Sequence, residues 1–192
     1  MLFRSLLEWN RRGRRDGLAP LLAGLAAAVG VGSFLFHTFA NRWSELADIV
    51  PILTFVSAYT AAAILRFTGP RLYPGIAPAL VAVALVTPGV WVASSRGAAA
   101  VAAGTDPFNG SGQYLPAAVG LVVLAALLAV RRRAVAPWIV GAAATFSAAL
   151  VFRTVDLAVC AVFPVGTHFL WHVFDGLTVG LLLQGLVRVP LR

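Results

Sequence analysis

Long runs of apolar residues, separated by short groups of Arg, Pro, Gly and Asn, dominate this chain. A helix needs about 20 predominantly apolar residues to cross the hydrocarbon core of a bilayer, and each of these runs is that long or nearly so. The runs predict six transmembrane helices, at residues 18–40, 46–67, 75–94, 114–130, 136–160 and 165–187. The predicted fold class is therefore all-α, a polytopic integral membrane helix bundle.

The pattern also divides the chain into a basic amino-terminal segment, residues 1–17, and a six-helix membrane domain, residues 18–192. The first apolar run follows the basic segment, as it would in a secretory signal peptide. It is longer than the usual apolar region of a signal peptide, however, and no cleavage site of small residues closes it. We expect this run to be retained as a helix.

Composition excludes a water-soluble globule, because 60% of the 192 residues are hydrophobic, 11% are charged and the mean hydropathy is +0.88. A net charge of +8 raises the possibility of nucleic-acid binding, but the arginines are scattered between apolar runs and are typical of topology signals. No nucleic-acid partner is expected. The single cysteine, Cys160, cannot form an intrachain disulfide, and we expect it to be a small apolar residue.

The distribution of arginine predicts the orientation of the chain. When the six helices alternate, 12 of the 15 arginines fall on the side of the two termini, and Arg42, Arg96 and Arg153 fall on or toward the other. Cytoplasmic loops carry an excess of basic residues, so both termini are predicted to be cytoplasmic.

Ionisable side chains are costly inside apolar helices, which makes each of them a candidate functional residue. His37 lies near the end of the first predicted helix and Asp48 near the start of the second. His168 and His172 open the last helix. In the predicted topology all four lie toward the non-cytoplasmic face, at a similar depth.

The spacing of the histidines indicates a metal site. His168 and His172 are four residues apart, so they share one helix face and are displaced by about 6 Å along its axis. With His37 they are the chain's three histidines. Three imidazoles with a fourth position open to water are typical of catalytic zinc. Bound zinc lowers the pKa of water to about 7 and polarises a carbonyl, which suits hydrolysis of an amide or an ester.

Two further residues fit that chemistry. Asp48 is the candidate general base, and Ser33, one turn before His37, is the candidate hydrogen-bond donor to a developing oxyanion. A nucleophilic serine would instead need an imidazole that binds no metal. The hydroxyl of Ser33 has a structural alternative as well, a hydrogen bond to the backbone carbonyl one turn earlier.

Structural interpretations of the other polar residues stay open. The two histidines of the last helix are compatible with a packed pair or with haem ligation. Arg153 and Asp156, three residues apart, fit an intrahelical ion pair or a role in orienting a metal ligand. Asp175 fits either a hydrogen bond that orients His172 or a purely structural one. The loop at residues 95–113 is a connector or a gate for lipid entry.

These residues together resemble the alkaline ceramidase family, within a superfamily of membrane hydrolases that includes the adiponectin and progestin receptors and the hemolysin III proteins. The resemblance lies in residues 32–37 (GSFLFH), Asp48, residues 153–156 (RTVD) and residues 166–172 (GTHFLWH). It implies hydrolysis of the amide bond of ceramide to a sphingoid base and a fatty acid, within the bilayer. The resemblance implies that the zinc ligands are His37, His168 and His172. It also implies that Asp48 activates the water and that Ser33 donates a hydrogen bond to the oxyanion.

The chain departs from the family at its amino-terminal end. The family has seven spans, so six predicted spans suggest an abbreviated form without the first one. The family's calcium site is an acidic and aromatic cluster before that first span. Residues 8–10 (EWN) lie beside five arginines on the predicted cytoplasmic side, so calcium dependence is not predicted.

The leading functional hypothesis is a zinc-dependent intramembrane lipid amidase. The alternatives are a zinc hydrolase of another lipid ester or amide, and a receptor-like or structural membrane protein with a non-catalytic zinc site. A proton-coupled transporter would use Asp48, Asp156 and Asp175 as relays, but the chain lacks the inverted repeat expected of one. The acyl-chain and head-group preference and the oligomeric state do not follow from the sequence.

Overall fold

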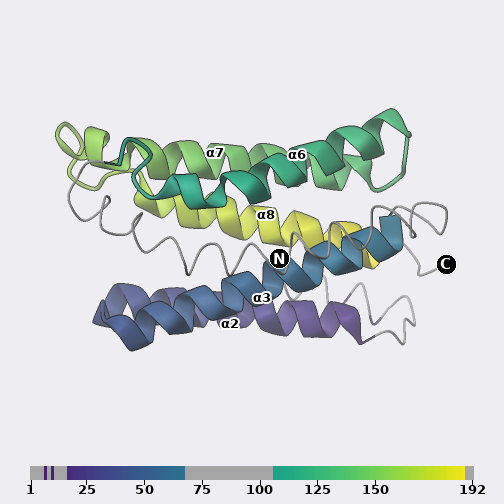
Figure 1. The fold of residues 1–192 in the computed structure, drawn as a ribbon, viewed down its shortest axis with the longest axis horizontal. Coiled ribbons are helices and arrows are strands. Elements are labelled where there is room, and N and C mark those ends of the chain that lie inside the picture. The colour runs from purple at the N-terminus through teal and green to yellow at the C-terminus, as the bar shows by residue number, and fades with distance from the viewer. Residues whose placement is uncertain (1–6, 8–9, 11–16, 68–105, 189–192) are drawn as a thin grey trace. The chain divides into compact units, whose positions relative to one another are not determined.

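The computed structural model describes residues 7, 10, 17–67 and 106–188, and nearly all of these residues lie in long α-helices (Figure 1). Contacts divide the chain into two compact units, residues 1–88 with 186–192 and residues 89–185. The elements are α2 (Leu18–Phe39), α3 (Arg42–Phe67), the short 3-10 helix η2 (Ser111–Tyr114), α6 (Leu115–Val130), α7 (Ala136–Cys160) and α8 (His168–Arg188).

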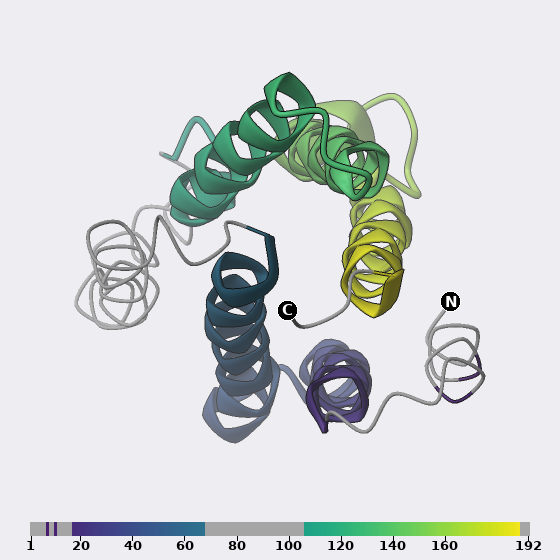
Figure 2. The same ribbon diagram turned by 90° about the vertical axis from the view of Figure 1, so that its right-hand side faces the viewer.

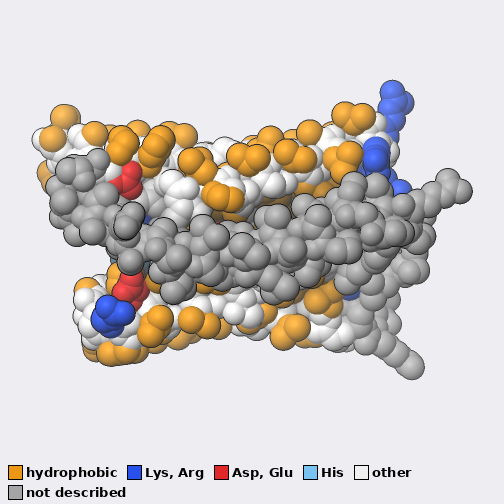
Figure 3. Space-filling view, viewed as in Figure 1, with side chains coloured by type: hydrophobic (Ala, Val, Ile, Leu, Met, Phe, Trp, Pro, Cys, Tyr) orange, Lys and Arg blue, Asp and Glu red, His pale blue; other side chains and the backbone are white. Residues whose placement is uncertain are grey.

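Five helices of the described residues are long and apolar enough to cross a membrane. They correspond to five of the six predicted spans, and the remaining one, residues 75–94, lies outside the described residues. Large apolar side chains also cover much of the visible helix surface (Figure 3), as expected where helices face lipid. Examples more than half exposed are Leu21, Val31, Val119, Val123 and Leu157. The protein is an integral membrane helix bundle.

A tight turn joins α2 to α3 in the first unit. α2 ends at Phe39, and the next residue, Ala40, adopts a left-handed conformation (φ 48°, ψ 45°) and donates its N–H to the carbonyl of Phe36. Asn41 and Ser44 then cap α3 reciprocally: the Ser44 N–H donates to Asn41 Oδ1 (3.1 Å), and the Asn41 N–H donates to Ser44 Oγ (3.0 Å). This cap starts α3 at Arg42, four residues earlier than predicted.

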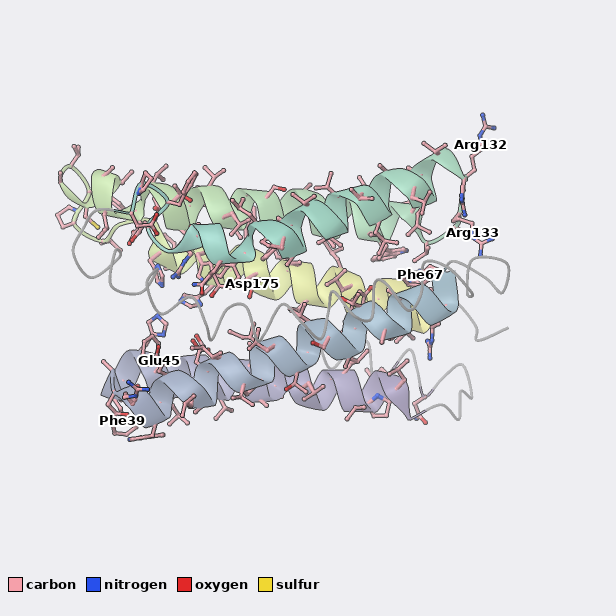
Figure 4. The ribbon with its side chains drawn as sticks, viewed as in Figure 1. Phe39, Glu45, Phe67, Arg132, Arg133 and Asp175 are labelled. Atoms are coloured by element: carbon pink, nitrogen blue, oxygen red, sulfur yellow. The ribbon has the colours of Figure 1, made fainter. Side chains whose placement is uncertain are left out.

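The far end of α3 is fixed by a buried arginine. Arg66 is 5% exposed, and its Nη1 donates to the carbonyl of Leu186, 2.8 Å away. The last three residues of α8 therefore pack with α3 in the first unit. Figure 4 shows Phe39 and Glu45 at the α2–α3 turn and Phe67 at this opposite end of α3.

In the second unit, α6 and α7 lie side by side and α8 lies along α7 (Figure 2). Arg132 and Arg133 mark the α6–α7 turn (Figure 4), where Arg132 has φ 47°. Gly185 admits the close approach of α7 to α8, because a Cβ there would lie 3.2 Å from Val135 and 3.3 Å from Trp138. Small residues at helix contacts are typical of membrane bundles.

Candidate metal centre

Two of the candidate ligands lie on the first turns of α8. The ring centroids of His168 and His172 are 4.9 Å apart, with an angle of 76° between the ring planes. His168 is partly buried and His172 is exposed. The expectation that four-residue spacing would place both imidazoles on one helix face is confirmed.

The carboxylate of Asp156, on α7, fixes the residue at which α8 begins. Asp156 Oδ1 accepts the N–H of Thr167 (2.6 Å) and the N–H of His168 (2.9 Å). The hydroxyl of Thr167 donates to the carbonyl of Phe152 (2.6 Å). A negative side chain satisfies the amide groups that a helix start leaves without intrahelical partners and interacts favourably with its dipole. The position of His168 is therefore tied directly to α7.

Glycine is required just before this helix start. Gly166 has φ +65°, a left-handed conformation that L side chains rarely adopt. A Cβ there would also meet Asp156 Oδ1 and would lie 2.8 Å from Cys160 Sγ. Cys160 Sγ is 4.0 Å from the same carboxylate oxygen. Hence the turn between α7 and α8 closes tightly around the Asp156 carboxylate.

The prediction of an ion pair between Arg153 and Asp156 is wrong: among the described residues, the two side chains have other partners. Asp156 instead binds the start of α8, and the guanidinium of Arg153 turns to aromatic rings. Its Cζ lies 5.3 Å from the centroid of the Trp171 ring and 5.6 Å from that of Tyr114. The centroids of the two rings are 5.2 Å apart; Trp171 forms a buried core with Ala149 and Leu150, and Tyr114 packs against that core.

The described part of the predicted 95–113 loop is anchored to α7. Asp106 Oδ1 accepts the N–H of Phe108 (2.9 Å), and Asp106 Oδ2 accepts the N–H of Gly110 (2.7 Å). Asn109 Nδ2 donates to the backbone carbonyl of Arg153 (2.9 Å). These bonds connect residues 106–110 to one another and to α7, and residues 95–105 lie outside the described residues.

The third candidate ligand, His37, lies on α2 in the first unit. Its Nδ1 donates to the backbone carbonyl of Ser33, at 2.8 Å. This bond selects the tautomer in which Nε2 carries the lone pair that a metal requires. The contact uses the backbone of Ser33, so the predicted role of the hydroxyl as an oxyanion donor stays a prediction.

A close contact between α2 and α3 brings Asp48 beside the same part of α2. A Cβ on Gly32 would meet the backbone carbonyl of Ala47 and lie 2.9 Å from the Cα of Asp48. The two backbones therefore touch at the residue before Ser33, and Asp48 Oδ1 is buried there. Within the first unit, the structure places Asp48 next to the turn of α2 that carries Ser33 and leads to His37.

Other predicted residues stand apart from these contacts. Asp175 lies on α8, three residues after His172 (Figure 4), and its proposed hydrogen bond to that imidazole stays a prediction. Glu8 and Trp9, considered for a calcium site, lie outside the described residues. The sequence analysis assigned no positioning role to five residues that the structure places in these contacts: Gly32, Asn109, Tyr114, Gly166 and Trp171. Two signals were available in the sequence, a glycine within an apolar helix (Gly32) and a Gly-Thr pair before a helix (Gly166 and Thr167).

Comparison with known proteins identifies no relative for this chain: no protein-family model, no curated protein and no solved structure matches it.

Proposed function

We propose that this protein is a zinc-dependent intramembrane lipid amidase that hydrolyses the amide bond of ceramide or a similar lipid. The observations that carry the proposal are the two imidazoles of α8, whose ring centroids lie 4.9 Å apart, and the imidazole of His37 on α2, whose Nδ1 hydrogen bond leaves Nε2 for a metal. We assign His37 as the third ligand of the ion that His168 and His172 would hold. The likeness of residues 32–37 and 166–172 to the alkaline ceramidase motifs supports this assignment.

The chemistry of these donors fits zinc. Neutral imidazoles are common zinc ligands, and a site of three histidines keeps a fourth position for water or substrate. The hydrogen bond from His37 Nδ1 to a backbone carbonyl is the kind of contact that orients metal-binding imidazoles. When bound, zinc would supply a Lewis acid that polarises the substrate carbonyl and lowers the pKa of water.

The remaining chemistry would fall to residues of α2 and α3. In amide hydrolysis, the oxygen of water forms a bond to the carbonyl carbon and the C–N bond breaks. We assign Asp48 to accept the proton that water loses and to deliver it to the leaving nitrogen. We assign the hydroxyl of Ser33 to donate a hydrogen bond to the carbonyl oxygen as it gains negative charge. The Gly32 contact supports this pairing, because it keeps both residues on adjoining turns.

The proposed orientation follows from arginine. Arg132 and Arg133 lie at the α6–α7 turn, at the opposite end of α7 from Asp156 and the start of α8. By the positive-inside rule, we assign that turn and both termini to the cytoplasmic side and the histidines to the opposite face. Protease accessibility of a tag at either terminus in oriented vesicles tests the assignment.

The decisive experiment measures metal and turnover in the same preparation of the full chain. We expect about one zinc per chain and release of fatty acid from ceramide, with His172→Ala losing both the metal and at least about 1,000-fold in rate. Thr38→Val is the matched control, because Thr38 follows His37 and its hydroxyl binds only a carbonyl of its own helix, that of Phe34. Full activity in metal-free protein would overturn the proposal.

A panel of substrates separates the proposed amidase from the alternatives. Matched lipid esters and amides with one acyl chain distinguish an esterase from an amidase. A receptor-like or structural protein with a non-catalytic zinc site predicts no turnover of any lipid by the wild type. In that case His37→Ala would still lower the thermal stability of zinc-loaded protein, because the metal would then only hold helices together.

A further inference from the structure

The side chain of Arg153 forms a candidate anion-binding site that does not involve the histidines. It lies on α7, seven residues before the last helical residue Cys160, which corresponds to about 10 Å along the axis. Trp171, which its guanidinium approaches, is three residues after the start of α8, about 5 Å along that axis. The cation therefore lies near the end of α7 that leads into α8. Because the ends of membrane-spanning helices lie near the head groups, and arginine is a long side chain, we infer that it can reach them.

The guanidinium of Arg153 contacts the faces of two aromatic rings. A cation over an aromatic ring within about 6 Å of the centroid is attracted by the ring's negative face. The rings of Tyr114 and Trp171 provide two such contacts, at 5.6 and 5.3 Å. An aromatic ring offers no oxygen or nitrogen acceptor, so neither contact provides the conventional hydrogen bonds that the five N–H donors of arginine can make.

Those donors have no protein acceptor in the described part of the chain. Arg153 Nε is buried there without a hydrogen-bond partner, and the nearest carboxylate in sequence, Asp156, is engaged by the backbone of α8. The backbone carbonyl of Arg153 is itself bonded by Asn109, which fixes this turn of α7 to the 106–110 loop. The arginine is thus held in place while its charge is unmatched by any described acidic group.

An unmatched cation in a membrane helix is costly unless an anion balances it. The planar fork of arginine binds carboxylate and phosphate with two parallel hydrogen bonds. We propose that Arg153, packed against the rings of Tyr114 and Trp171, binds the oxyanion of an amphiphile, either the phosphate of a lipid head group or the carboxylate of a fatty acid. This inference does not depend on the metal or on catalysis.

The test titrates the full chain in a neutral detergent with dodecyl phosphate, dodecanoate, inorganic phosphate and dodecanol, and measures binding by calorimetry. A chelator is present throughout, because oxyanions also bind zinc. We expect the oxyanion amphiphiles to bind at least about tenfold more tightly than dodecanol. Preference for dodecyl phosphate identifies a head-group site, and preference for dodecanoate identifies a fatty-acid site. Equal binding of dodecanol, or equal binding of inorganic phosphate, overturns the proposal.

Variants locate the binding. Arg153→Gln should bind the oxyanion amphiphile at least about tenfold more weakly than wild type. The affinity of Arg153→Lys should lie between those of wild type and Arg153→Gln, because lysine keeps the charge but not the planar fork. Arg42→Gln is the matched control, because Arg42 is exposed and lies in the other unit, and its affinity should equal that of wild type. Unchanged affinity in both Arg153 variants overturns the assignment. Since the wild-type comparison of dodecyl phosphate with dodecanol needs no variant, a misfolded Arg153→Gln protein does not prevent the test.

Discussion

The two units hold their candidate residues by different means. In the α2–α3 hairpin, the backbone of one helix touches the backbone of the other, at Gly32 and Ala47. In the second unit, the side chain of Asp156 reaches from α7 to the backbone of α8 across a tight turn. A backbone contact cannot be replaced by another side chain, whereas a side-chain contact can be partly replaced by water or by a similar group. The first unit should therefore tolerate substitution less well than the second.

The largest effect is expected for Gly32→Ala. The new methyl group would meet the Ala47 carbonyl, and since backbone on both sides must move, the free energy of unfolding should fall by about 3 kcal/mol. The hydrolase activity proposed above should be lost as Asp48 moves away from Ser33. Unfolding by denaturant titration in mixed micelles measures the change.

Gly30→Ala is the control for Gly32→Ala. Gly30 lies on the same helix, and a Cβ there has no atom within 4 Å among its described surroundings. Alanine should be neutral at this position or should stabilise the helix by about 0.5–1 kcal/mol. If the two variants unfold alike, the contact at Gly32 does not determine the packing of α2 on α3.

A smaller effect is expected for Asp156→Asn. The amide retains an oxygen acceptor but loses the negative charge at the start of α8, so the free energy of unfolding should fall by about 2 kcal/mol. Glu45→Gln is the control, because it also replaces a carboxylate by an amide, at the α2–α3 turn. Among the described residues the Glu45 side chain makes no hydrogen bond, so the free energy of unfolding should change by less than about 0.5 kcal/mol. Equal stability of Asp156→Asn and wild type would show that the cap contributes nothing.

The smallest effect is expected for Thr178→Val, which tests a polar contact in the interior of the second unit. Thr178 Oγ1 and Thr145 Oγ1 are 2.8 Å apart, between α8 and α7. Hydrogen bonds between membrane helices contribute about 0.6 kcal/mol on average, so the loss should be of that size. Thr54→Val should have no effect, because that exposed hydroxyl binds only a carbonyl of its own helix, that of Val50. A loss much above 1 kcal/mol would mean that the pair has a larger role.

Hydrophobic length predicted most of the fold. The predicted ranges 18–40 and 136–160 match α2 and α7 to within a residue, because a membrane span needs a fixed number of apolar residues. The start of α3 was missed because hydropathy does not register polar caps. Asn41 and Ser44 were readable as a helix start, since asparagine is a preferred cap residue.

The site was predictable where it depends on local spacing and unpredictable where it depends on tertiary contacts. Four-residue spacing placed His168 and His172 on one face without further information. The partners of Asp156 lie 11 and 12 residues away across a turn, whereas the neighbouring Arg153 is three residues away and suggested an ion pair. Hydropathy does not separate Gly32 from Gly24 and Gly30 on the same helix, because the distinction lies in what faces each of them.

The turn that closes around Asp156 also contains the only cysteine of the chain. Cys160 is partly buried, and its sulfur faces a space that admits no additional carbon at Gly166. Because the sulfur packs against this turn, we expect a thiol reagent to label it more slowly in the folded protein than in the unfolded chain, and the labelling rate would then follow the opening of the turn. The native protein thus carries a built-in probe of local opening, which can be followed as metal or lipid is added, without removing other cysteines.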